Sequence, residues 1–154
     1  PAAVEFLRAK LNLKPEEVVN YLNKKCGILG ISGFSSDCRD LTAASEEGNE
    51  RATLALEMLA YRVKKYVGSY IAVLGGVDAI VFTGGIGENN SRLRRRVCEN
   101  LAYLGLTFDY DANVVRGEDT IISAPDSKVK VALITTNEEL MIARDTMNIV
   151  QNEE

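Results

Sequence analysis

A glycine-rich stretch from Gly84 to Asn90 contains the residue types that bind phosphate. Its three glycines within four positions allow backbone amides to approach an anion closely, and a helix expected after them directs its N-terminus to the same place. The spacing matches neither the Walker sequence, which needs Gly-Lys-Ser/Thr, nor the dinucleotide fingerprint, which needs a third glycine where Asn90 stands. Such turns are also simple loop geometry. The stretch by itself leaves both interpretations open.

A second candidate is Asp37-x-Arg39, within a segment rich in Ser and Gly. An arginine binds phosphate oxygens in a bidentate manner, and an aspartate holds that guanidinium or a metal-bound water. The competing interpretation is a helix cap with a surface ion pair, because Asp and Ser before a helix are common caps. Cys38 between them has no base nearby in the sequence, so we interpret it as a small space-filling residue.

Glu138 and Glu139 form the third candidate, at the start of an expected helix. Acidic residues there interact favourably with the helix dipole, and Thr136 with Glu139 has the spacing of a capping box. The functional alternative is that Glu138 faces a cleft and helps to hold Mg²⁺, which prefers oxygen ligands and retained waters.

Hydrophobic periodicity indicates the elements that must position these groups. Apolar residues recur every three or four positions between residues 50 and 74, which is typical of one face of a long helix. Pro15 suits the first turn of an earlier helix at 15–26. Helices are predicted at residues 1–11, 15–26, about 37–47, 50–74, about 91–104 and from 136 onward, and strands at 77–83, 120–123 and 129–135. The run from Ile28 to Ile31 is predicted as a strand or a loop.

Alternating helices and buried strands predict an α/β domain with a mixed sheet flanked by helices. Ligands of such sheets gather where strands lead into helices at their C-terminal ends. The segments 83–91 and 135–139 are two such places, so we expect the functional site there.

Composition excludes several classes of protein. The 154 residues suit one domain, and 46% hydrophobic with 26% charged residues is ordinary for a folded domain. The net charge of −4 gives no reason to expect nucleic acid as a partner, and we interpret the basic cluster at 92–96 as a solvated helix face. No signal peptide or membrane span is evident, and three spaced cysteines without histidine indicate the cytoplasm rather than disulfides or zinc.

Four long segments carry a resemblance to a known family. They are ISGFSSDCRDL (31–41), EEGNERATLALEMLAYRVKKYVGSY (46–70), GGVDAIVFTGGIGEN (75–89) and PDSKVKVALITTNEELMIARDT (125–146). Together they resemble the acetate kinase family over essentially the whole chain. The resemblance implies a ribonuclease-H-like (actin-like ATPase) fold and phosphoryl transfer from ATP to acetate with Mg²⁺. It also implies that residues 1–154 are the C-terminal domain portion, without the N-terminal domain.

The resemblance also implies roles for individual residues. Asp37, Cys38 and Arg39 correspond to the family's Asp-x-Arg nucleotide contact, and Gly85, Ile86, Gly87, Glu88 and Asn89 to its nucleotide loop. Glu138 corresponds to a glutamate associated with Mg²⁺. The chain departs from the usual pattern at Gly84, where alanine is common, and at Cys38, where a larger apolar residue is common.

The same resemblance places the family's catalytic histidine and arginine and its acetate pocket upstream of Pro1, so no catalytic residue is expected in this chain, which we expect to be inactive alone. A propionate or butyrate kinase, differing mainly in that pocket, remains an alternative. A non-catalytic actin-like nucleotide-binding module is a second, and a dinucleotide-dependent dehydrogenase, disfavoured by Asn90, is a third. The expected partners are a nucleotide, a small carboxylate, the N-terminal domain and a second copy of the chain through the 50–74 helix, but neither nucleic acid nor a membrane.

Overall fold

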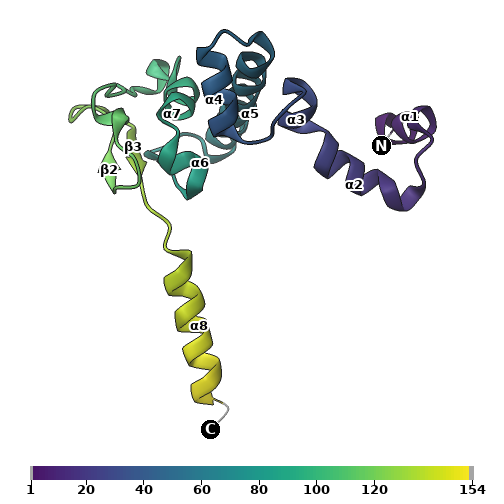
Figure 1. The fold of residues 1–154 in the computed structure, drawn as a ribbon. Helices are drawn as coiled ribbons and strands as arrows, with labels where there is room; N and C mark the ends of the chain where they lie inside the picture. Colours follow the sequence, from purple (N-terminus) through teal and green to yellow (C-terminus); the bar gives the residue numbers. More distant parts are fainter. Residues whose placement is uncertain (1, 153–154) are drawn as a thin grey trace. The chain divides into compact units, whose positions relative to one another are not determined.

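The computed structural model describes residues 2–152 and divides into two compact units, Pro1–Tyr66 and Val67–Glu154. The first unit is helical (Figure 1). Its elements are α1 (Ala2–Leu11), α2 (Pro15–Lys25), α3 (Gly27–Ser32), α4 (Cys38–Glu46) and the start of α5 (Glu50–Leu74), which continues into the second unit. The helices predicted at 1–11, 15–26, 37–47 and 50–74 are confirmed within one or two residues, except at Pro1, which lies outside the described residues.

The core of the first unit forms where α4 meets the start of α5. Leu41, Ala52, Ala55 and Leu56 are buried there, and α3 and Cys38 pack against them. The prediction of a strand or loop at 28–31 is wrong, because this run forms α3 and packs on that core. Gly33 ends α3 with a φ of 83°, which glycine adopts readily, and donates its N–H to the Leu29 carbonyl at 2.8 Å.

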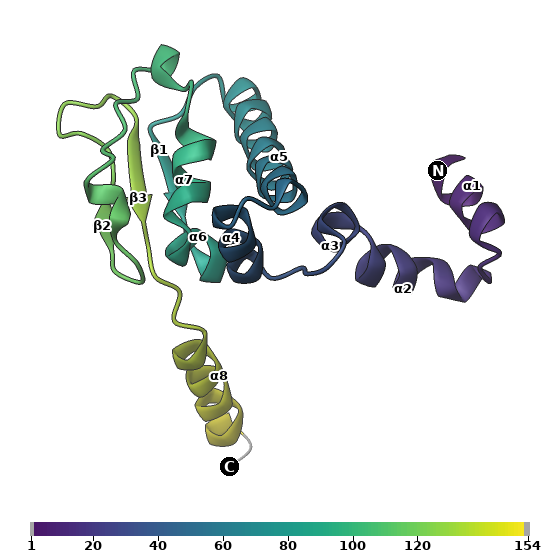
Figure 2. The same cartoon turned by 45° about the horizontal axis from the view of Figure 1, so that its top comes forward.

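The second unit contains a three-stranded mixed sheet in the order β1-β3-β2. Strand β1 (Ala79–Phe82) is parallel to β3 (Lys130–Leu133), which is antiparallel to the short β2 (Thr120–Ile121). Figure 2 shows α6 (Gly84–Asn89) and α7 (Ser91–Cys98) beside this sheet. The strands lie within the predicted ranges, and the predicted α/β class with a mixed sheet is confirmed.

Only one face of the sheet is buried. Ile80 and Phe82 of β1 are opposite Val131 and Leu133 of β3, and all four side chains are buried. Val81, which points to the other face, is 50% exposed. The alternation follows from the period of two along a strand.

Two predictions after β1 are wrong. The glycine-rich stretch forms the short helix α6 instead of a turn. The helix predicted to reach residue 104 ends at Cys98, because Glu99 leaves helical geometry with ψ 136° and Asn100 has a positive φ of 69°. The 3₁₀ helix η1 (Ala102–Leu104) follows, and η2 (Ala112–Val114) precedes β2.

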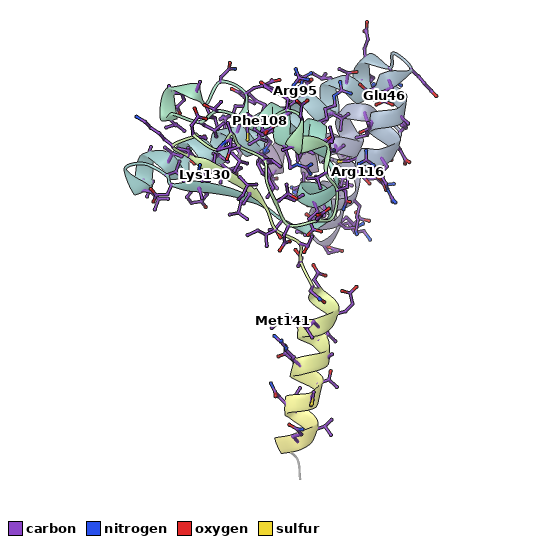
Figure 3. All side chains as sticks on the ribbon, turned by 90° about the vertical axis from the view of Figure 1, so that its left-hand side faces the viewer. Glu46, Arg95, Phe108, Arg116, Lys130 and Met141 are labelled. Atoms are coloured by element: carbon purple, nitrogen blue, oxygen red, sulfur yellow. The ribbon has the colours of Figure 1, made fainter. Side chains whose placement is uncertain are left out.

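The last helix is α8 (Glu138–Asn152). The predicted cap at Thr136 is wrong, because the Asn137 side chain accepts the Leu140 N–H at 3.0 Å instead. Side chains at 138–151 are exposed, including the labelled Met141 in Figure 3, which is 53% exposed. Within residues 2–152, no helix combines the length and apolar character needed to span a bilayer.

Candidate functional site

In the first unit, Asp37 begins α4 and holds Arg39. One Asp37 carboxylate oxygen accepts the backbone N–H of Arg39 at 2.7 Å, and the other accepts the guanidinium Nη2–H at 2.6 Å. The carboxylate therefore combines the helix cap and the ion pair that the sequence offered as the simple interpretation. Hydrogen bonds from the Arg39 side chain and backbone lower the pKa of Asp37 to about 2.

The Arg39 side chain is 90% exposed despite this pairing. Its contacts in the described structure use Nε and Nη2, both to Asp37. A guanidinium has five N–H donors, so the remaining edge is available to a second anion. The geometry therefore permits both a structural ion pair and a phosphate contact at the same arginine.

Cys38 contributes packing at this point. Its side chain is partly buried against the core around Leu41. Burial, followed by the nearby Asp37 charge, raises the pKa of the Cys38 thiol. Both effects favour the neutral thiol, which agrees with the interpretation of Cys38 as a space-filling residue.

In the second unit, α6 presents its glycines in two different environments. A Cβ on Gly87 would lie 3.4 Å from the backbone carbon of Phe82, in van der Waals contact with the end of β1. A Cβ on Gly85 would meet no atom within 4 Å, and Gly85 is exposed. An anionic ligand therefore has direct access to the backbone at Gly85, which satisfies one requirement of a phosphate-binding segment.

The segment between β3 and α8 is joined to α6 through Thr136. The Thr136 hydroxyl lies 2.7 Å from the Thr83 hydroxyl and accepts the Gly84 N–H at 3.1 Å. In return, the Thr136 N–H donates to the Glu88 carboxylate at 2.8 Å, and this bond is the largest cause of a lowered pKa of Glu88. The two places predicted to form the site at the strand ends are thus hydrogen-bonded to each other.

Glu138 lies two residues beyond this junction, in the first turn of α8, and is exposed. The described residues contain no group of three or more His, Cys, Asp or Glu arranged to hold a metal ion. Mg²⁺ commonly takes one or two carboxylates together with water and substrate phosphates. Glu138 therefore suits only a site of that kind, completed by a bound nucleotide.

The interpretation of the 92–96 basic cluster as a solvated face is wrong for Arg94, which is fully buried. Its Nη1 donates to the carbonyls of Gly87 and Glu88, both at 2.8 Å. The sequence offered a signal, since Arg94 shares a helix face with the buried Val97 and Cys98, three and four residues later.

Asp119 is a second residue that the sequence analysis did not select. Its carboxylate accepts the backbone N–H of Thr135 at 2.7 Å and the hydroxyl of the same residue at 2.8 Å. These two bonds lower the pKa of Asp119 and fix the backbone immediately before Thr136. Nothing local in the sequence signals this contact across 16 residues.

Comparison with known proteins assigns the family. The family model for the acetokinase family matches residues 1–144. The chain belongs to the acetokinase family. Among curated acetokinase relatives, an acetate kinase from Halothermothrix orenii is 55% identical over 152 residues, which are 99% of this chain and 38% of the relative.

Solved structures of the family agree with the fold. An acetate kinase from Porphyromonas gingivalis has a TM-score of 0.90 and 48% identity over 97% of this chain and 38% of its own. A propionate kinase from Francisella tularensis has a TM-score of 0.81 and 38% identity over 93% of this chain and 36% of its own. The predicted fold class, a ribonuclease-H-like (actin-like ATPase) α/β domain, is confirmed by these acetokinase neighbours. The chain spans 38% of the length of the curated acetate kinases from Halothermothrix orenii and Desulfitobacterium hafniense.

Proposed function

We propose that this chain is the C-terminal, nucleotide-binding portion of an acetate kinase, which transfers the γ-phosphoryl group of ATP to acetate and yields acetyl phosphate and ADP. The observation that carries the proposal is α6, a glycine-rich segment at the end of β1 with an open approach to Gly85. Its sequence lies within the region matched by the acetokinase family.

The proposed roles follow from chemistry. Arg39 uses the free edge of its guanidinium to bind phosphate, while Asp37 orients it and Cys38 supports the turn. The backbone from Gly85 through Ile86, Gly87 and Glu88 to Asn89 lines the nucleotide site. Because the Glu88 carboxylate already binds Thr136, its contribution to the ligand comes from its backbone.

Glu138 orients hydrated Mg²⁺ in this proposal. A bound ion would supply positive charge that stabilises the phosphates during transfer. In-line phosphoryl transfer depends mainly on positioning and charge stabilisation, so the residues of this chain hold the donor rather than attack it.

We also propose that the chain alone does not complete the reaction. It contains no histidine and spans 38% of the length of its curated acetate kinase relatives. The acceptor carboxylate and the groups that stabilise the transferring phosphoryl would come from the remainder of such a protein. A propionate kinase portion is the second candidate, favoured by the resemblance to the propionate kinase from Francisella tularensis.

The test is a trapped-product assay with a binding measurement. Purified chain is incubated with ATP, Mg²⁺ and acetate, propionate or butyrate, and acyl phosphate is trapped as hydroxamate, while calorimetry measures binding of ATP, ADP and NADH. We expect ATP and ADP binding without turnover. Binding of NADH but not ATP would overturn the proposal in favour of a dehydrogenase.

Linking the chain to the remaining portion of an acetate kinase supplies the positive arm of the assay. We expect acetate-dependent hydroxamate formation from the linked protein, and a preference for propionate would support the second candidate. Nucleotide binding without any transfer in the linked protein would support a non-catalytic binding module.

We further propose that the chain forms a homodimer in the cytoplasm. Helix α5 exposes Tyr70, Val73 and Leu74, which are three and four residues apart and share one helix face, by 64%, 82% and 72%. Exposed apolar surface of this kind is typical of an interface. Cys26, Cys38 and Cys98 are thiols rather than disulfides, which is typical of proteins in a reducing compartment. Light scattering should give a dimeric mass for the wild-type chain and a lower mass for Tyr70→Glu. A monomeric mass for the wild-type chain, unchanged in Tyr70→Glu, would contradict the dimer.

A further inference from the structure

Arg94 is a fully buried cation, and within residues 2–152 its hydrogen-bond partners include no carboxylate. Nη1 binds the carbonyls of Gly87 and Glu88 at 2.8 Å each. Nη2 binds the carbonyls of Asn113 and Val115 at 2.8 and 2.7 Å, and Nε binds the Asn113 side-chain oxygen at 2.9 Å. All five donors of the guanidinium are therefore directed at neutral oxygen atoms.

Such an arrangement is costly unless every donor is satisfied. Burial is the main cause of the lowered pKa of Arg94, with a smaller effect from the charge of Arg116. A guanidinium remains protonated in spite of such shifts. Its charge is stabilised here by carbonyl dipoles, two of which come from the last turn of α6, where helix carbonyls lack partners within the helix.

Helix α6 needs this support because it is only six residues long and includes three glycines. Isolated helices of this length are unstable, and glycine increases the entropy lost on ordering. On one side α6 is held by Thr136 through Gly84 and Glu88. On the other side it is held by Arg94, which connects it to Asn113 and Val115.

Asn113 completes the connection. Its side-chain oxygen accepts from Arg94, and its amide group donates to the Ser91 carbonyl at 2.9 Å. Asn113 is itself buried, so both functions of its amide are satisfied inside the unit. The first turn of α7 is thus joined to the same residue that orients the guanidinium.

We propose that Arg94 is a positioning residue for nucleotide binding, which fixes the backbone of residues 85–89 through the carbonyls of Gly87 and Glu88 without contacting the ligand. The inference rests on the proposed nucleotide site. It distinguishes Arg94 from Arg39, which contacts phosphate in that proposal and is exposed.

The test uses Arg94→Lys and Arg94→Met in the 154-residue chain, with Arg92→Met as the matched control. Arg92 lies in the same helix but is only partly buried. Hydrogen exchange of peptides covering residues 84–90 is measured without nucleotide, and ATP and ADP affinities are measured by calorimetry. Both are recorded well below each variant's thermal midpoint.

Removal of charge-assisted hydrogen bonds predicts faster exchange of the 85–89 amides and weaker ATP binding, each by about 10-fold to 100-fold. Lysine keeps the charge but cannot reach both pairs of carbonyls, so it rescues only part of the loss. Arg92→Met is expected to behave as wild type. Exchange that increases equally over β1 and β3 would indicate a general structural role and overturn the proposal.

Two further outcomes separate the positioning role from the nucleotide site. If the wild-type chain binds nucleotide and Arg94→Met shows the same hydrogen exchange and the same affinity, the positioning role of Arg94 is overturned while the nucleotide site stands. A wild-type chain that binds neither ATP nor ADP would refute the nucleotide site itself. If Arg94→Met does not fold, Arg94→Lys and Asn113→Ala decide the same question, because Asn113→Ala removes one acceptor of Arg94 and the hydrogen bond to Ser91 but leaves the guanidinium in place.

Discussion

The two candidate phosphate-binding segments are constructed differently. Around Asp37, the contacts that orient Arg39 span two residues of sequence. Around α6, the Glu88 carboxylate binds Thr136, which lies 48 residues later in the chain. Arg94 connects α6 to Asn113, which lies 19 residues after Arg94. The first segment is organised by its own sequence and the second by the folded unit around it.

This difference has consequences for stability. A cap formed by adjacent residues persists as long as its helix does, even if other parts of the chain rearrange. A segment held by distant contacts is ordered only when the sheet, the β3–α8 connection and η2 are all in place. Substitutions far from α6 are therefore expected to affect it, whereas Asp37 and Arg39 should respond mainly to changes nearby.

The largest effect is expected from Phe82→Ala. Phe82 is buried in β1, so its truncation leaves a cavity in the core of the second unit and lowers the free energy of unfolding by about 3–5 kcal/mol. Denaturant unfolding measures the loss, and hydrogen exchange locates it. Peptides that contain Asp37 and Arg39 should keep their wild-type rate of hydrogen exchange. An equal increase in exchange in these peptides would contradict the contrast between the two segments.

Asn113→Ala should have the next largest effect. The substitution leaves the buried Nε of Arg94 without its acceptor, which costs about 1–3 kcal/mol. The loss is expected in unfolding experiments and in ATP affinity. Val114→Ala in the same 3₁₀ helix is the control, because Val114 is 74% exposed. Equal losses in the two variants would show that the helix, rather than its contact with Arg94, matters.

Thr136→Val tests the opposite side of α6 at smaller cost. The substitution removes the hydroxyl that binds Thr83 and the Gly84 N–H but keeps side-chain shape, so we expect a loss of about 0.5–1.5 kcal/mol. Exchange at Gly84 should increase. Thr136→Ser retains the hydroxyl and should behave as wild type, whereas a Ser variant as damaged as the Val variant would show that the loss does not depend on the hydroxyl alone.

The smallest effect is expected at Asp37 and is measured by pH. Its pKa of about 2 in the folded chain lies below the ordinary value of 3.8, so its contribution to stability is complete above the ordinary pKa and is lost as pH falls toward 2. NMR titration of the carboxyl carbon should give a midpoint near 2 in wild type. In Arg39→Gln the midpoint should rise toward the ordinary value, and an unchanged midpoint would exclude the guanidinium as the main cause.

Sequence patterns alone predicted most elements of the chain. The α4 cap at Asp37, the long α5 and the strands around β1 and β3 all depend on neighbouring residues or simple periodicity. The run from Ile28 to Ile31 was misassigned because a short apolar run is compatible with several structures until its packing partner is known.

The candidate site could be located from sequence but not assembled. Glycine spacing and strand ends indicated 84–90 and 135–139, and the acetokinase resemblance selected residues within them. The link through Thr136 was missed because a hydroxyl before a helix looks like a cap, and here Asn137 takes that role. Asp119 and Asn113 carried no local signal at all.

The sequence by itself determined which helix faces are apolar, where strands alternate and which polar residues can cap a helix, since these properties arise within a few residues. Only the tertiary structure decided that Arg94 is buried and that α6 is held from both sides. A buried charge is tolerated only when every donor finds an acceptor, and those acceptors come from 6 to 21 residues away along the chain. Their convergence is a property of the packed unit, which no local pattern encodes.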